Sequence, residues 1–210
     1  MPRAGQGLLS RGRPLSLSID WFDDVAGGKF LQGATTVKAL GSIFSMFLSL
    51  MVVSPALAGG WEVITKEAGI TVSKKELPDR DLPIFKGTGV VDASVIEILA
   101  ILDDTPRNSE WMHNCHSAAK LKVVDDMVRI VYNRTSAPWP VSDRDVVLRS
   151  KAVWDPDKAL VTVRFKSITT PLKSEVDGVV RMPRLVGFYK LQALSWKKTR
   201  VTYQVDADPG

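Results

Sequence analysis

The residues with the greatest capacity for chemistry in this 210-residue chain lie in one short run, His113-Asn114-Cys115-His116. Imidazole and thiolate groups are zinc ligands, and a structural zinc site takes four of them in tetrahedral geometry. The chain contains two histidines and one cysteine in all, so no distant fourth ligand of these types exists. We therefore predict no metal site here. A single cysteine also excludes an internal disulfide.

Other patterns typical of catalytic sites are equally weak. The sequence has no Gly-x-Ser-x-Gly motif, so a serine hydrolase of that type is not indicated. Asp125 and Asp126 are adjacent carboxylates, but turn chemistry explains such a pair between two strands. Gly87-Thr88-Gly89 is not followed by the Gly-Lys-Ser/Thr of a phosphate-binding loop. The sequence predicts no cofactor.

The charge of the chain gives little support for a nucleic-acid partner. There are 28 Lys and Arg residues against 23 Asp and Glu residues, which gives a net charge of +5. The basic residues are dispersed along the sequence and nearly balanced by acidic ones, so no clustered basic footprint is visible. We predict no nucleic-acid binding, and only a mild attraction to anionic surfaces.

The first 58 residues differ from the remainder of the chain. Lys38 precedes an uncharged apolar stretch over residues 39–53, and Ser54-Pro55-Ala56-Leu57-Ala58 follows it. A basic residue, a short apolar core and a small-x-small end are the parts of a secretory signal peptide. We expect residues 1–58 to be an upstream segment plus a signal peptide cleaved after Ala58, with residues 59–210 as the mature periplasmic or secreted domain. The alternative is an uncleaved segment that anchors the protein in the inner membrane.

The mature domain begins with two strand patterns followed by two helix patterns. Residues 69–74 and 84–91 predict strands. Ser94 and Glu97 have the spacing of a capping box, and apolar residues recur after them at helical period. Thr105-Pro106 predicts a short second helix, with the threonine as its N-cap.

From about residue 121 the pattern changes to alternation, which is typical of an antiparallel sheet with one buried face. Hairpin turns are predicted at Asp125-Asp126 and at residues 155–158, and further strands over 179–182, 185–193 and 200–205. This order of elements predicts the α+β class. The predicted apolar face consists of Val128, Ile130, Tyr132, Val146, Leu148, Ala152, Trp154, Val161, Val163, Phe165, Val201, Tyr203 and Val205.

A set of short motifs runs through the same region. The most specific is PWPVSDRD at residues 138–145. The others are Trp111-Met112 with Cys115, Val131-Tyr132, Thr170-Pro171, GVVR at 178–181, VTY at 201–203 and DPG at 208–210. On these motifs, the chain from about Trp61 to its end resembles the StAR-related lipid-transfer (START) domain.

This resemblance implies a helix-grip fold, in which a curved antiparallel sheet wraps a long C-terminal helix around a hydrophobic tunnel. The chain stops at residues 206–210, where the family continues into that helix, so we expect a domain without its C-terminal helix. The resemblance implies non-enzymatic binding, and transfer or sensing, of one lipid or sterol-like molecule, with transient contact with a membrane surface. The residues expected to bind the lipid are Arg129, Tyr132, Trp139, Arg144, Leu148, Trp154, Phe165, Arg181 and Tyr203.

Two other functions are compatible with the residues. Helix-grip relatives include polyketide cyclases and aromatase-like proteins, whose chemistry would need an ionisable pair inside the tunnel. Arg129 with Asp145 or Tyr132 is the candidate pair. A structural or partner-binding periplasmic domain is the third reading. The sequence indicates neither which lipid is bound nor the oligomeric state.

Overall fold

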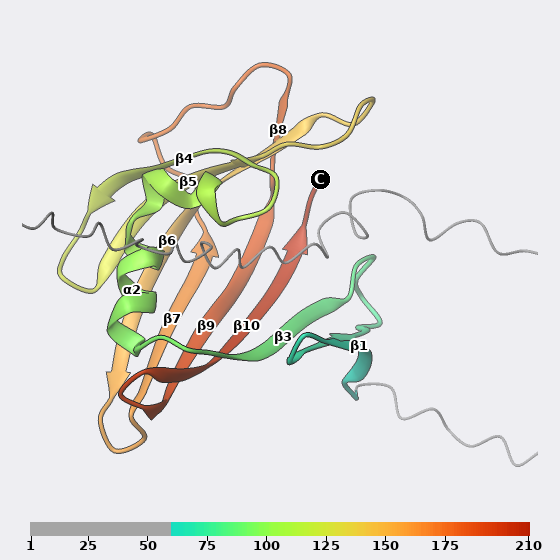
Figure 1. Cartoon of the computed structure of the whole chain (residues 1–210). Helices are drawn as coiled ribbons and strands as arrows, with labels where there is room; N and C mark the ends of the chain where they lie inside the picture. Colours follow the sequence, from blue (N-terminus) through green and yellow to red (C-terminus); the bar gives the residue numbers. More distant parts are fainter. Residues whose placement is uncertain (1–59) are drawn as a thin grey trace, which may run out of the picture.

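The computed structural model describes residues 60–210, which form one large curved antiparallel sheet with two short helices on one side (Figure 1). The predicted upstream segment and signal peptide lie outside the described residues. Within residues 60–210, no helix is long and apolar enough to cross a bilayer. The elements are β1 (Glu62–Glu67), β2 (Ile70–Lys75), β3 (Ile84–Val91), α2 (Val95–Asp103), η2 (Thr105–Glu110), β4 (Cys115–Val123), β5 (Val128–Thr135), β6 (Asp143–Asp155), β7 (Leu160–Ser167), β8 (Val179–Arg181), β9 (Arg184–Ser195) and β10 (Lys198–Asp208).

The strands follow the order β1-β2-β3-β10-β9-β7-β6-β5-β4 across the sheet. All neighbours in this order are antiparallel, and the short β8 pairs in parallel with the start of β6. The pairing of β3 with β10 joins the first three strands of the described chain to its last hairpin, β9–β10. The predicted α+β class and helix-grip type of sheet are confirmed, although β1 was not predicted.

Helix α2 begins where the capping box predicts. The Ser94 side chain accepts a hydrogen bond from the Glu97 backbone N–H at 3.2 Å, and the Glu97 carboxylate accepts one from the Ser94 N–H at 2.8 Å. The hydrogen bonds that its carboxylate accepts from the Ser94 N–H and the Ser94 hydroxyl hold the pKa of Glu97 below its usual value. The apolar stripe of the helix then buries Ile98 against Val161 and Leu191 of the sheet. Local capping and sheet packing therefore act together to place α2.

The second helix differs in detail from its prediction. It is a short 3-10 helix, η2, and its N-cap is Asp104, with no side-chain cap. Thr105 is not the N-cap because it is the first residue inside the helix, where it is buried. The Asn108 side-chain amide donates to the Asn133 side-chain oxygen at 3.1 Å. This contact ties η2 to β5.

The register of the strands defines two faces of the sheet, because directly opposite residues in a ladder share a face. We call the face that α2 covers the inner face, and the opposite one the outer face. Val161 and Leu191 pack against α2 and so belong to the inner face. Alternation along β6, β7 and β10 places the predicted apolar residues of those strands on the same side. The prediction is therefore confirmed for these three strands.

The predicted apolar face is wrong for β5. Val131 lies opposite Leu148, which is on the inner face, whereas Tyr132 lies opposite Val147 on the outer face. Val128 and Ile130 share the outer side with Tyr132. The alternation is ambiguous in β5 because apolar residues stand on both of its sides. The segment after β7, residues 168–178, covers this part of the outer face: the Ile168 N–H donates to the Val147 carbonyl, and the Lys173 ammonium lies over the Tyr132 ring.

Close packing at Gly187 leads to a test of the sheet. A Cβ there would lie 2.2 Å from the Gln204 carbonyl oxygen and 2.6 Å from Cζ of Phe165. We expect Gly187→Ala to lower the free energy of unfolding by about 2 kcal/mol or more, because both neighbours must move. The measurement is urea unfolding followed by circular dichroism.

Gly87→Ala is the matched control for this test. Gly87 lies opposite Tyr203 on the inner side of β3, and nothing stands within 4 Å of its missing Cβ. We expect this variant to stay within about 1 kcal/mol of the wild type. Equal destabilisation by the two alanines would show that the close approach at Gly187 is unimportant.

Candidate functional site

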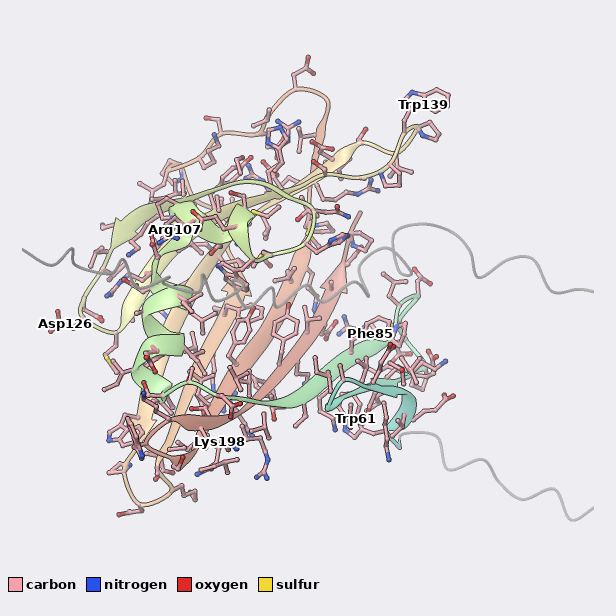
Figure 2. All side chains as sticks on the ribbon, viewed as in Figure 1. Trp61, Phe85, Arg107, Asp126, Trp139 and Lys198 are labelled. Carbon is pink, nitrogen blue, oxygen red and sulfur yellow. The ribbon has the colours of Figure 1, made fainter. Side chains whose placement is uncertain are left out.

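The inner face carries an apolar and aromatic surface beside α2. Its buried centre is made by Val146, Leu148, Phe165 and Val205. Among residues 60–210, this surface is built from strands and the turn before β9, and Phe85 stands on β3 across the sheet from α2 (Figure 2). The partly buried residues packed around the centre are Phe85, Val131, Met182, Leu185, Tyr189, Tyr203 and Ala207. We call these residues together the inner-face cluster.

Three aromatic rings form the middle of the inner-face cluster. The ring centroids of Tyr189 and Tyr203 are 4.7 Å apart, and that of Phe165 lies 5.8 Å and 6.1 Å from them. Offset rings at these separations attract one another beyond their buried area. Gly187 allows the packing, since only hydrogen fits between β9 and the Phe165 ring. The result is a rigid aromatic surface.

Burial raises the pKa of both Tyr189 and Tyr203 well above the ordinary tyrosine value. Their hydroxyl groups therefore stay neutral at physiological pH. No carboxylate or cationic side chain belongs to the inner-face cluster. The cluster is therefore suited to contact with an apolar molecule and not to proton transfer near neutral pH.

A carboxylate at the end of α2 binds two basic residues at the margin of the inner face. Asp103 accepts from Nζ of Lys120 at 2.7 Å and from Nε of Arg129 at 3.0 Å. The hydrogen bond from Lys120, followed by the nearby charges of both partners, lowers the pKa of Asp103. Arg129 also donates to the Asp125 carbonyl oxygen. This predicted lipid-binding arginine therefore holds α2 to the sheet.

Arg181 and Tyr132 are brought together on the outer face. Arg181 binds Asp145 with two hydrogen bonds, at 2.6 Å and 3.1 Å, and donates to the Ser174 carbonyl at 3.2 Å. Asp145 is only 1% exposed. Burial, and then the neighbouring Asp145, raise the pKa of Tyr132 to about 12. The Lys173 ammonium lies 4.6 Å from the centroid of the Tyr132 ring. These contacts fasten the segment after β7 over the sheet.

This arrangement separates the ionisable pair that an enzyme of the cyclase type would use. Arg129 lies opposite Ser150, on the inner side of the sheet, whereas Tyr132 and Asp145 are on the outer side. The backbone pleat therefore holds Arg129 away from both proposed partners. The described residues also hold no group of three metal-ligating side chains.

The remaining predicted residues lie at the margins or at the centre of the inner face. Trp139 is 92% exposed on the turn between β5 and β6 (Figure 2). Arg144 donates to the carbonyl oxygens of Ser142 at 2.5 Å and Pro209 at 3.4 Å. Trp154 is on the inner side, near the other end of β6, and is 49% exposed. Only three of the predicted residues belong to the inner-face cluster, namely Leu148, Phe165 and Tyr203.

Sequence reasoning missed several members of the cluster. Leu185 and Tyr189 alternate along β9 with a small Gly187 between them, and this period-two pattern could have found them. The sequence places Phe85 on one face of its strand together with Val91, but it does not assign that face to the apolar side of the sheet. Met182 is predicted as the last residue of a strand over 179–182, whereas β8 ends at Arg181 and Met182 lies between β8 and β9.

The geometry defines a class of protein: a curved antiparallel sheet with an aromatic inner face and helices on that side, the helix-grip fold. A protein-family model described as START domain matches residues 56–210. The chain belongs to this START domain family.

Individual relatives agree with this assignment. An uncharacterized protein of Pseudomonas aeruginosa is 31% identical over 155 residues, which cover 74% of this chain and 75% of the relative. The crystal structure of a STAR-related lipid transfer protein from Xanthomonas axonopodis is similar, with a TM-score of 0.66 and 29% identity, over 72% of this chain and 83% of that one. Human STARD10 shares the fold, with a TM-score of 0.62 and 21% identity, over 71% of this chain and 61% of that one.

The contacts of Asp103 predict acid sensitivity in the docking of α2. Because its pKa is lowered in the folded state, Asp103 stabilises the fold above its unfolded pKa of about 4, and this contribution is lost as the pH falls through the folded value. We expect Asp103→Asn to reduce the free energy of unfolding at pH 7. The difference from the wild type should shrink below about pH 4.

Urea unfolding at a series of pH values measures this difference. Asp126→Asn is the control, because Asp126 is exposed in the nearby turn and forms no ion pair with any residue of the described domain. A wild-type advantage over Asp103→Asn that persists unchanged at pH 3 would contradict the role assigned to the carboxylate.

Proposed function

We propose that the inner-face cluster binds one hydrophobic molecule, a lipid or a sterol-like compound, without chemical change. The observation that carries this proposal is the neutral aromatic group of Phe165, Tyr189 and Tyr203 on the inner side of the sheet. The similarity to a STAR-related lipid transfer protein over most of the described chain supports it. The separation of Arg129 from Tyr132 and Asp145 favours binding over catalysis.

The physical advantage of such a surface lies in exchange with a membrane. Each CH₂ group that leaves water for an apolar environment gains about 0.8 kcal/mol, so a free lipid crosses water rarely. A protein surface of similar polarity makes uptake and release close to balanced. Neutral aromatic rings carry no charge whose desolvation would oppose the entry of an apolar ligand. We therefore propose transfer or sensing of the ligand through transient contact with a membrane surface.

A pair of adjacent residues on β3 tests the assignment of the binding face. Gly87 faces the inner side opposite Tyr203, and Thr88 faces the outer side, where its hydroxyl lies 3.3 Å from that of Thr202. We expect Gly87→Trp to fill the ligand's place and weaken binding at least about tenfold, since steric overlap removes favourable contacts. Thr88→Trp adds the same bulk to the other face and should leave binding within about threefold.

The measurement for this pair is titration with parinaric acid, a fluorescent fatty acid, together with mass spectrometry of lipids that copurify with each variant. Thermal unfolding of both variants confirms that each is folded. Equal binding by the wild type and Gly87→Trp, with both folded, would overturn the proposed site.

We also propose that the mature protein is periplasmic or secreted. The support is the arrangement of Lys38, the apolar stretch at 39–53 and the small residues up to Ala58. N-terminal sequencing of protein from the periplasmic fraction should begin at Gly59. Ala56→Arg with Ala58→Arg should block this cleavage and retain the protein in the membrane fraction. A wild-type protein that stays uncleaved in the inner membrane would favour the anchored alternative instead.

A further inference from the structure

The outer face of the sheet carries basic residues that are far apart in the sequence. Arg149 and Lys151 come from β6, Arg164 and Lys166 from β7, and Lys190 and Arg200 from β9 and β10. Alternation places all six on the side of the sheet opposite the inner-face cluster. All six are exposed. We call these six residues the basic face.

Four members of the basic face form two like-charged pairs. Arg149 lies directly opposite Lys166, and Lys151 lies directly opposite Arg164. Like charges at directly opposite positions of a ladder repel each other and destabilise the sheet. None of the six forms an ion pair with any residue between 60 and 210. Lys190 has a neutral contact, with its ammonium 5.1 Å from the centroid of the Phe188 ring.

The acidic residues on the same strands do not neutralise this charge. Asp145 is paired with Arg181, Asp155 with Lys158, and Asp206 with Arg80 and Arg184. Asp143 is paired with Arg134, and Asp208 accepts a hydrogen bond from the Gly210 N–H near the end of the chain. The basic face is therefore an array of unneutralised positive charge on a broad sheet surface.

We infer that the basic face binds the anionic headgroup surface of a phospholipid bilayer. Long lysine and arginine side chains that project from the same face of a sheet can all approach a planar anionic surface. Each one increases the partitioning of the protein onto the membrane about fivefold. The contact deepens the proposed function, because a carrier of hydrophobic molecules must reach a membrane. Adsorption itself needs no bound ligand, so it can be tested separately.

The structure favours a bilayer over other anionic partners. The basic face lies on strands within a larger sheet, so it presents neither a helix nor an isolated two-stranded ribbon to a nucleic-acid groove. Its aromatic residue, Phe188, is half-buried beneath Lys190 and offers no free ring for base stacking. Protein interfaces tend to exclude lysine from their centres, whereas this face has lysine and arginine at its centre.

The position of the basic face also gives it a distinct role. A protein adsorbed through the outer face keeps its inner-face cluster directed away from the bilayer. The basic face therefore concentrates the protein at the membrane. Ligand exchange then takes place in a different orientation, with the inner face toward the bilayer.

The test is flotation of the full-length protein with vesicles of equimolar phosphatidylglycerol and phosphatidylcholine, compared with pure phosphatidylcholine. Comparing the two kinds of vesicle removes any membrane binding that does not depend on lipid charge. In the basic-face variant, Arg149, Lys151, Arg164 and Lys166 are all replaced by glutamine. We expect its preference for anionic vesicles to fall on the order of a hundredfold or more. Raising the salt concentration to about 0.5 M should remove the wild-type preference.

A matched variant replaces four lysines outside the basic face, Lys66, Lys75, Lys197 and Lys198, with glutamine. It has the same net charge as the basic-face variant, and its preference should fall less than about tenfold. Arg149→Lys with Arg164→Lys keeps the charge and should keep the preference, because a planar anionic surface does not require the guanidinium shape. An equal loss in both glutamine variants, or loss in the lysine variant, would overturn the inference.

Two further arms separate this inference from other readings. Tighter binding to a short DNA duplex or to polyglutamate than to anionic vesicles would overturn it in favour of that partner. Parinaric acid binding should be unchanged in the basic-face variant. If the wild type does not bind parinaric acid, the proposed function fails. Salt-sensitive adsorption through the basic face would still stand in that case.

Discussion

The alternation of side chains along each strand is the constraint on which both surfaces of this domain depend. In β9, Tyr189 faces the inner-face cluster, and its immediate neighbour Lys190 faces water with the basic face. A shift of one residue in the pairing would exchange apolar and charged side chains across the whole sheet. The close approach at Gly187 opposes such a shift, because only glycine fits between Gln204 and Phe165. Packing on one side of the sheet thus fixes the charge pattern on the other.

Two carboxylates attach the pieces that cover the sheet. Asp103 holds α2 on the inner side through Lys120 and Arg129, and Asp145 holds the segment after β7 on the outer side through Arg181. Arginine often recognises a lipid headgroup, so the sequence favours that role for Arg129 and Arg181. In the structure, their hydrogen bonds are used inside the protein. The buried centre of the inner face is made of apolar and aromatic side chains, which suit an apolar ligand better than a charged one.

The sequence predicted most strands, both hairpins and the start of α2, because their signals are local. The capping box of Ser94 and Glu97 spans three residues and needs no tertiary information. Prediction failed where distant segments meet. Tyr132 was assigned to the inner face because its outer cover comes from a segment much later in the chain. Basic residues on four strands looked dispersed in the sequence, and only the register shows that Arg149 meets Lys166.

Each face of the sheet has a feature that costs stability in the isolated protein. On the outer side, like charges repel at Arg149 with Lys166 and at Lys151 with Arg164. On the inner side, aromatic rings of the cluster remain partly exposed to water. An anionic surface would relieve the repulsion between the like charges, and this effect would weaken with salt. An apolar ligand would relieve the exposure of the aromatic rings, with little dependence on salt. Because the two relieving partners differ in physical nature, membrane attraction and ligand binding can be altered independently in one small domain.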